Sequence, residues 1–434
     1  MSDVEEQEDE IQSNEEEVSD VLFEQDALII QDDIDIISGG DDDANDNLVL
    51  AEADFDGKSA LRGFGYNLLA NEDGSLKYPE VHLDKEMIRT GLSHIARTLD
   101  TFEFAYSRYD GRNRALTEID ILGQYVHLRA VDLSGNRIKS FKSLAPMKHL
   151  LVLLVNDNQM ISLEEIPHLP FLQALSAKRN GLKSAQGLFS NSLTHLQLSF
   201  NKISNLIPFD DATFPNLTVL ELRGNNLQSL NGLNVPTLIR LFVAQNKLKN
   251  LNGLKTCTNL THLHARDNVI STLENFPRLE KLEYVNLRNN LLKRFSQTQF
   301  LGNSPNIRTL IAMGNPVAEL DDYKMEMIAA NPNLKRLDKQ PITEIDLVQG
   351  RQIRSGREKG ILPPVNDDSE VLTPPMPSME DTMAEEDEED EDDDDNDDGS
   401  PPPEDPEDQD KDQEPPPRSS GGPEMDVEIR KAST

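Results

Sequence analysis

Histidine side chains could bind a metal ion, and a cysteine could bind a metal ion or attack a substrate. His262 and His264 alternate along one expected strand and would project from the same face of it. The repeat spacing places His195 three strands away, roughly 14 Å at about 4.8 Å per strand, which is beyond the reach of a shared metal ion. The histidine pair therefore lacks a third ligand, and we predict neither a metal site nor a bound cofactor.

The one cysteine, Cys257, is expected on a connection outside the sheet, and no histidine stands beside it to act as a base. A single cysteine forms no intramolecular disulfide, which fits a reducing compartment. The sequence also has no glycine-rich phosphate loop, no metalloprotease helix motif and no nucleophile elbow. We predict that the protein is not an enzyme and takes no small-molecule substrate.

A repeated pattern, Leu-x-x-Leu-x-Leu-x-x-Asn-x-Leu, positions these side chains and occurs nine times between Leu128 and Val317. Successive asparagines are 21 to 25 residues apart, within the range of leucine-rich repeats. The pattern predicts an α/β leucine-rich repeat solenoid with a parallel sheet on its concave side. We interpret the asparagines as a buried structural ladder that satisfies backbone groups of the turns: Asn136, Asn158, Asn180, Asn201, Asn225, Asn246, Asn268, Asn290 and Asn315.

Composition shifts divide the chain into five segments. Apolar residues at spacings of 4, 3 and 4, from Ile88 to Leu99, predict an amphipathic helix over 85–99 that caps the array. The segments are an acidic, mostly disordered N-terminal part (1–84), an N-terminal capping helix region (85–115), the solenoid (116–315), a C-terminal repeat cap (316–345) and a disordered, proline-rich acidic tail (346–434). Inside the first segment, Leu28, Ile29, Ile30, Ile34, Ile36 and Ile37 form a candidate docking motif.

The formal charge of −37 is unevenly distributed. Residues 111–340 hold 27 basic and 18 acidic residues, a net charge of +9, so the flanks hold 15 basic and 61 acidic residues, a net charge of −46. Acidic flanks repel nucleic acid, so we expect no nucleic-acid partner. The sequence has no apolar run of about 20 residues and no secretory signal, so we expect a soluble protein of the cytoplasm that is not bound to a membrane.

The outward positions of the expected strands give the concave surface. Its central part carries a basic stripe with two aromatic residues, and aromatic and arginine side chains are common anchors of protein interfaces. We predict a protein-binding site there, the alternative being a solvated face: Lys178, Arg223, Arg240, Phe242, Arg266, Tyr284 and Arg288. Apolar spots near the ends, Leu154 with Val152 and Ile311 with Met313, are expected to be covered by the caps or by a partner.

Several blocks resemble the ciliary leucine-rich repeat-containing protein 23 family over about residues 85–345. They are MIRTGLS at 87–93, LTEI at 116–119, YVHLRAVDL at 125–133, VLELRGN at 219–225 and LKRLDK at 334–339. The resemblance implies a non-catalytic scaffold of the axonemal radial spoke, associated with the spoke head and with ciliary and flagellar motility. It also implies other radial spoke subunits as partners and a place in the cytoskeleton of the axoneme.

Two other functions are compatible with a repeat array of this kind. One is a regulatory subunit that docks on a protein phosphatase, as another 22-residue repeat family does. The other is an acidic histone-chaperone-like protein, although such proteins begin their repeats near the first residue and have tails that are poor in proline. The N-terminal blocks favour the spoke.

The first prediction tests the register of the repeats. Leu222 is expected to point into the core, so Leu222→Ala should lower the free energy of unfolding by about 2–5 kcal/mol. Chemical denaturation of both proteins measures the difference. An unchanged stability would show that the assigned register is wrong.

Overall fold

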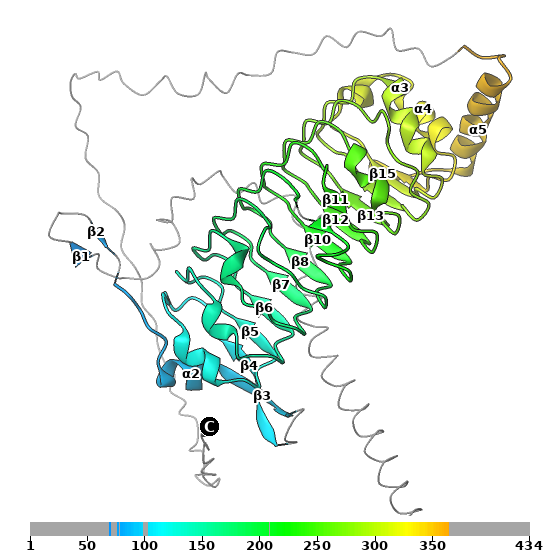
Figure 1. Ribbon diagram of the computed structural model, residues 1–434. Helices are drawn as coiled ribbons and strands as arrows, with labels where there is room; N and C mark the ends of the chain where they lie inside the picture. The colour runs from blue at the N-terminus through cyan, green and yellow to red at the C-terminus, as the bar shows by residue number, and fades with distance from the viewer. Residues whose placement is uncertain (1–68, 71–75, 78, 99–102, 208, 364–434) are drawn as a thin grey trace, which may run out of the picture. The chain divides into compact units, whose positions relative to one another are not determined.

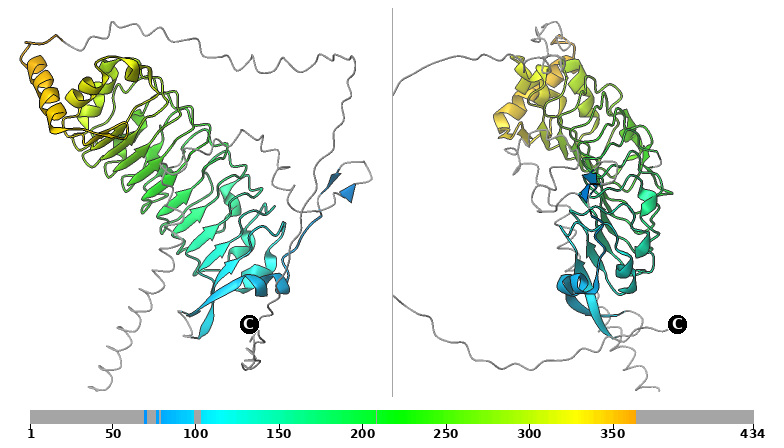
Figure 2. Two further views of the ribbon diagram at one scale, coloured as in Figure 1. Left: turned by 180° about the vertical axis from the view of Figure 1, so that it is seen from behind. Right: turned by 90° about the vertical axis from the view of Figure 1, so that its left-hand side faces the viewer.

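The computed structural model describes residues 69–70, 76–77, 79–98, 103–207 and 209–363. Within them, one 13-stranded sheet runs from β3 to β17 and is parallel from β4 to β16. Figures 1 and 2 show neighbouring strands lying side by side along the array. Its strands are β3 (Leu92–Arg97), β4 (Phe104–Asp110), β5 (Ala130–Asp132), β6 (Val152–Leu154), β7 (Ala174–Ser176), β8 (His195–Gln197), β10 (Val219–Glu221), β12 (Arg240–Phe242), β13 (His262–His264), β14 (Tyr284–Asn286), β15 (Thr309–Ile311), β16 (Arg336–Leu337) and β17 (Gln340–Pro341). This confirms the predicted leucine-rich repeat solenoid.

The short strands form because each places one leucine or valine inward between two outward residues. Leu220 pairs with Leu241, and Leu241 pairs with Leu263, so one buried residue lies above the next along the array. Leu222, which follows β10, is 0 % exposed. A single hydrophobic core therefore continues through all the repeats.

The connections on the other side of the core are too short for regular α-helices, and most form one turn. Their 3-10 helices are η2 (Asp120–Gln124), η3 (Lys142–Leu144), η4 (Leu163–Glu165), η5 (Asn252–Thr256), η6 (Gln299–Asn303) and η7 (Pro316–Glu319), with one α-helical turn, α3 (Phe295–Thr298). Two connections instead pair as parallel strands, β9 (Phe209–Asp210) with β11 (Leu233–Asn234). Before the array, β1 (Leu69–Ala70) and β2 (Leu76–Lys77) pair antiparallel.

The helix predicted over 85–99 is wrong in its second half. Helix α2 spans Lys85–Gly91, capped by Asp84, whose Oδ1 accepts a hydrogen bond from the backbone N–H of Met87 at 2.8 Å. At Gly91 the backbone lies against β4, because a Cβ there would be 2.3 Å from the carbonyl oxygen of Asp110. The chain then becomes β3, the antiparallel partner of β4. Tertiary pairing overrides the helical spacing.

The repeats also begin earlier than predicted. Strand β4 pairs parallel with β5, so the sheet starts inside the segment assigned to the capping region, before residue 116. Tyr109 of β4 is fully buried, in the position that leucine holds in later strands. Arg114 joins the parts of this end, because its guanidinium donates to the backbone carbonyls of Met87 and Asp110.

The boundary predicted at residue 84 lies too far along the chain. Leu83 is buried, and Val81 packs against the same core. The backbone N–H of Thr117 donates to the carbonyl of Val81 at 2.8 Å. Residues 79–84 are therefore part of the folded array, while the acidic residues 1–68, with the candidate docking motif, lie outside the described residues.

The C-terminal end is closed by the second antiparallel pair of the 13-stranded sheet, β16 with β17, and by helix α4 (Tyr323–Ala330). The Asp338 carboxylate accepts hydrogen bonds from the backbone N–H groups of Ala312 and Met313, at 2.7 and 2.8 Å. Its other oxygen accepts from the Tyr323 hydroxyl at 2.5 Å, and burial together with this carboxylate raises the pKa of Tyr323. Asp338 thus satisfies two backbone N–H groups of the turn that follows β15, at the C-terminal end of the array.

The tail predicted to be disordered from residue 346 begins instead as helix α5 (Glu344–Glu358). A capping box starts it: Thr343 Oγ1 accepts from the Asp346 backbone N–H, and the Asp346 carboxylate accepts from the Thr343 backbone N–H. The Lys324 ammonium and Thr343 lower the pKa of Asp346 to about 2. The proline-rich residues 364–434 lie outside the described residues.

Helix α5 packs closely on α4, which is why the segment folds (Figure 1). A Cβ on Gly350 would be 2.5 Å from Cγ2 of Ile328, so the two backbones approach where glycine stands. The Arg357 guanidinium binds both carboxylate oxygens of Glu326, at 2.5 and 2.6 Å. This two-bond geometry is the stronger form of an arginine–carboxylate pair.

The second prediction concerns this contact. Arg357→Met should weaken the docking of α5 by roughly 1.5–3 kcal/mol, the range for hydrogen bonds to charged groups, because Glu326 loses both bonds. Hydrogen exchange should speed up in 347–356 and stay unchanged in 195–290. Arg351→Met, which alters an exposed arginine of the same helix, is the control. Equal effects of the two variants would contradict the proposed anchor.

Candidate functional site

The outward side chains of the sheet lie in three columns. Val219 pairs with Arg240, Arg240 with His262, and His262 with Tyr284, which gives one flanking column. The same pairing continues from Ala130 to Thr309 and sets the central column from Asp132 to Ile311. The third column follows from backbone bonds of the next turn, such as Gln245 N–H to the Arg266 carbonyl at 3.0 Å. Side chains that follow one another in a column lie on neighbouring strands and are therefore close enough to touch.

Four rings meet on β12, β13 and β14. Phe242 stacks on His264 with ring centroids 4.4 Å apart, and His264 lies 4.7 Å from the Tyr284 ring at a tilted angle. His262 stacks on Tyr284 at 5.7 Å. We call Phe242, His262, His264 and Tyr284 the ring cluster. The sequence-based prediction included Phe242 and Tyr284 in the binding site but considered the two histidines only as metal ligands. Their adjacent places in the columns could have identified the cluster.

The two histidines of this site make stacking contacts with the aromatic rings. Burial, followed by the charges of His264 and Arg240, lowers the pKa of His262, so its imidazole is neutral at pH 7. His264 is 9 % exposed between its two aromatic neighbours. Among the residues that the structure describes, no three histidine, cysteine or carboxylate side chains converge as a metal site would require.

Three arginines of the predicted stripe occupy outward positions next to those of the ring cluster. Arg240 precedes Phe242 on β12, and Arg266 and Arg288 follow the central positions of β13 and β14. Arg240 and Arg288 are half-buried, whereas Arg266 is 9 % exposed and lies 3.7 Å from an Asp267 carboxylate oxygen. The structure thus gathers five of the seven predicted binding residues on β12, β13 and β14 and on the residues that directly follow β13 and β14.

The other two predicted residues are engaged elsewhere. Lys178 Nζ lies 3.3 Å from the Glu221 carboxylate, which also accepts from the Gln197 amide at 2.7 Å. Arg223 donates from Nε to Gln245 Oε1 at 3.1 Å, and its guanidinium lies over the Phe200 ring at 5.5 Å. Lys178 and Arg223 therefore belong to separate polar and stacking contacts on β7 and β10.

The apolar spots differ between the two ends. Val152 is 1 % exposed and packs with Ala130, Ala174 and Leu154 as a small cluster on the sheet. Ile311 is 3 % exposed, but Met313 beside it is 37 % exposed. The N-terminal spot is thus covered by its own neighbours.

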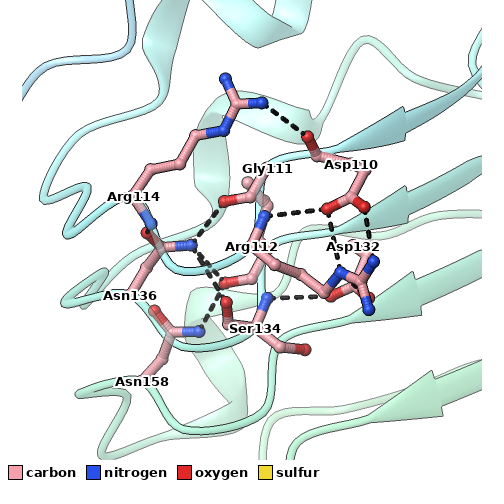
Figure 3. A network of polar contacts seen from close by, with 9 residues as sticks. Asp110, Gly111, Arg112, Arg114, Asp132, Ser134, Asn136 and Asn158 are labelled. Carbon is pink, nitrogen blue, oxygen red and sulfur yellow. Dashed lines mark hydrogen bonds and ion pairs between the residues drawn. The ribbon is translucent and has the colours of Figure 1, made fainter. Parts of the chain in front are cut away.

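The nine predicted ladder asparagines are all buried, at 1–8 % exposure. Each carboxamide bonds two successive coils, as Asn136 and Asn158 do near Gly111 and Ser134 in Figure 3. The residue before each of them has a left-handed backbone, with φ from 49° to 73°. Their hydrogen bonds go to backbone groups, so they hold the turns and do not face the concave surface.

Cys257 is on the convex side and fully buried. Burial raises the pKa of its thiol to about 11, so the thiolate is scarce at neutral pH. A nucleophilic cysteine needs a lowered pKa and access to substrate, and Cys257 has neither. No described helix is both long and apolar enough to cross a membrane.

The buried ladder, the parallel sheet and the exposed columns define a leucine-rich repeat protein, a class whose concave surfaces bind other proteins. The chain is 36 % identical over 273 residues to leucine-rich repeat-containing protein 23 of Bos taurus, covering 63 % of this chain and 80 % of the relative. The Xenopus tropicalis protein of that name is 37 % identical over 287 residues, covering 66 % and 82 %. The chain belongs to the leucine-rich repeat-containing protein 23 family.

Other similarities are more limited. Dynein axonemal assembly factor 11 of Danio rerio is 28 % identical over 120 residues, covering 23 % of this chain and 27 % of that protein. An internalin of Listeria monocytogenes matches the structure with a TM-score of 0.39 at 15 % identity, covering 58 % of this chain and 88 % of that chain. That similarity is weak, and the fold class rests on the strand pairing. No protein-family model matches the chain.

The third prediction tests the ladder. Asn225 donates to the carbonyls of Leu198 and Leu222 at 3.0 Å and accepts from the Ile203 backbone N–H at 3.0 Å. Asn225→Ala leaves these buried groups unpaired, and each costs about 1–3 kcal/mol. Chemical denaturation should show that the free energy of unfolding falls by an amount in that range or above it. Asn226→Ala, at the exposed neighbour, should change the free energy of unfolding little. A small loss at Asn225 would contradict the ladder.

Proposed function

We propose that this protein is a non-catalytic scaffold of the axonemal radial spoke, at the spoke head, where it supports ciliary and flagellar motility by binding other spoke subunits. Membership of the leucine-rich repeat-containing protein 23 family supports a protein-interaction role. The similarity to a protein named as an axonemal dynein assembly factor favours a ciliary location. The protein is then cytoplasmic and attached to the cytoskeleton of the axoneme.

The ring cluster with its three arginines is the observation that carries the proposed binding site. Aromatic rings offer large contact area with little loss of side-chain freedom, and arginine adds direction. Exposed ion pairs contribute only about 0–1 kcal/mol each, so Phe242 and Tyr284 should supply most of the affinity. Arg240 and Arg288 should set the orientation of the partner. A partner segment with acidic and apolar side chains fits this surface.

No reaction is assigned to the protein. The concave site offers neutral or partly buried histidines in ring contacts and arginines beside them, but no nucleophile paired with a base. Cys257 is buried on the other side of the core. The similarity to a protein named as an axonemal dynein assembly factor favours a ciliary scaffold over a phosphatase subunit or a histone chaperone. The acidic flanks oppose binding to nucleic acid.

The fourth prediction tests location and surface together. The full chain, expressed in ciliated cells, should stay with axonemes after detergent extraction. Arg240→Glu with Arg288→Glu should reduce the axonemal fraction severalfold, because both charges beside the rings are reversed. Lys202→Glu with Lys247→Glu makes the same charge change at exposed sites outside the concave columns and should leave the fraction unchanged.

Two results would count against the proposal. Complete extraction of the wild-type chain would contradict a place in the axoneme. Normal retention of the Arg240 and Arg288 variant, with its melting temperature unchanged, would move the interface away from the ring cluster. Phe242→Ala separates the ring contribution from the charge contribution in the same assay.

A further inference from the structure

The N-terminal end of the sheet has an open edge. Strand β3 (Leu92–Arg97) pairs with β4 on one side, and in the described part of the chain it is the last strand of the sheet. An unpaired edge presents backbone donors and acceptors that can bind another strand. The strand is six residues long, with a left-handed backbone at His94 (φ 52°), and the Arg97 carbonyl accepts a hydrogen bond from the Arg129 guanidinium at 2.9 Å.

The same hairpin exposes large apolar side chains. Ile95, Phe104 and Tyr106 are 64 %, 70 % and 45 % exposed. Ile95 is directly opposite Tyr106, and Arg97 is opposite Phe104, with its guanidinium 5.6 Å from the ring centroid. Together with Arg97 these residues form what we call the hairpin patch. Its apolar and positive character calls for a strand that alternates apolar and acidic residues.

Such a segment precedes the hairpin in this chain. Ile30, Asp32, Ile34 and Ile36 stand at alternating positions, so an extended backbone would present them on one face. Placing Asp32 beside Arg97 puts Ile34 beside Ile95 if the strands are antiparallel, and Ile30 there if they are parallel. Either direction matches apolar with apolar and acid with base.

The chain between this segment and the folded array is long enough to reach β3, and it enters the array at the N-terminal end, where β3 lies. The Pro79 carbonyl accepts a hydrogen bond from the Arg137 guanidinium at 2.9 Å, so the chain enters the fold beside the first repeats. Residues 38–78 separate this point from the segment, and an extended chain spans about 3.3 Å per residue. Tethering also raises the effective concentration of a segment at its site into the millimolar range.

We propose that residues 30–37 of the same chain dock on the free edge of β3 as an additional strand and cover the hairpin patch. This contact is independent of the proposed spoke function and of the ring cluster. It gives the acidic N-terminal flank a specific place on the N-terminal cap. A partner that carries a similar acidic and apolar strand would compete for the same edge.

Hydrogen exchange on the full chain tests the proposal. With the segment docked in about nine molecules of ten, exchange of edge amides in 92–97 should be about tenfold slower than in a chain that cannot dock. Ile34→Ser with Ile36→Ser should remove this protection. Leu48→Ser with Leu50→Ser, a matched change in the same acidic flank, should not. Amides of β8 report on the fold and should be equal in all variants.

A charge exchange tests the register. Arg97→Asp and Asp32→Arg should each remove the protection of 92–97, and the double variant should restore it. Arg97 is exposed, so the single change should leave the melting temperature unchanged. Protection that is absent from the wild-type chain, or that survives both serine substitutions at 34 and 36, overturns the proposal. Protection that grows with protein concentration also overturns it, because a second copy would then cover the edge.

Discussion

The parallel strands from β5 to β15 depend on the chain returning to the same side of the core within 21 to 25 residues, and a buried carboxamide stabilises each return. The ladder asparagine donates to carbonyls of its own coil and of the preceding coil, while its oxygen accepts from a backbone N–H of that preceding coil. Left unpaired, those buried groups would destabilise the turn. The residue before it adopts a left-handed backbone even where it is Phe200 or Asp267. Because each amide bonds two coils, neighbouring repeats share their stability.

This arrangement leaves few positions for function. Leucine and asparagine fill the inward places, so only the outward residues of each three-residue strand, and the one after them, can differ freely. Strand pairing then places these residues side by side in fixed order. The ring cluster is a direct result, since Phe242 and His264 are neighbours in the central column, and His262 and Tyr284 are neighbours in the flanking one. The site is therefore carried by rigid elements and not by loops.

The periodic part of the fold could be predicted from the sequence because it is local and repeated. Nine asparagines in register define the strands, the columns and the core leucines such as Leu222. The ends were harder. Residues 92–97 have helical spacing, and only pairing with 104–110 makes them a strand, although Phe104, Tyr106 and Arg108 alternate as strand residues do. Helix α5 was missed because its stability comes from Glu326 and Ile328 on α4, and no local pattern reports such contacts. In the site, the positions of the arginines could be predicted from the repeat pattern, but the stacking of the histidines on Phe242 and Tyr284 became evident only in the structure.

The two ends of the sheet differ in their capacity to pair with a further strand. At one end is a six-residue strand that carries isoleucine and arginine. At the other, β17 is two residues long and contains Pro341, which has no backbone N–H to offer a further strand. Extension of the sheet by edge pairing is thus favoured from one side only. Edge pairing between identical units would need both ends of the sheet, so the proline at the β17 end disfavours a continuous chain of such units.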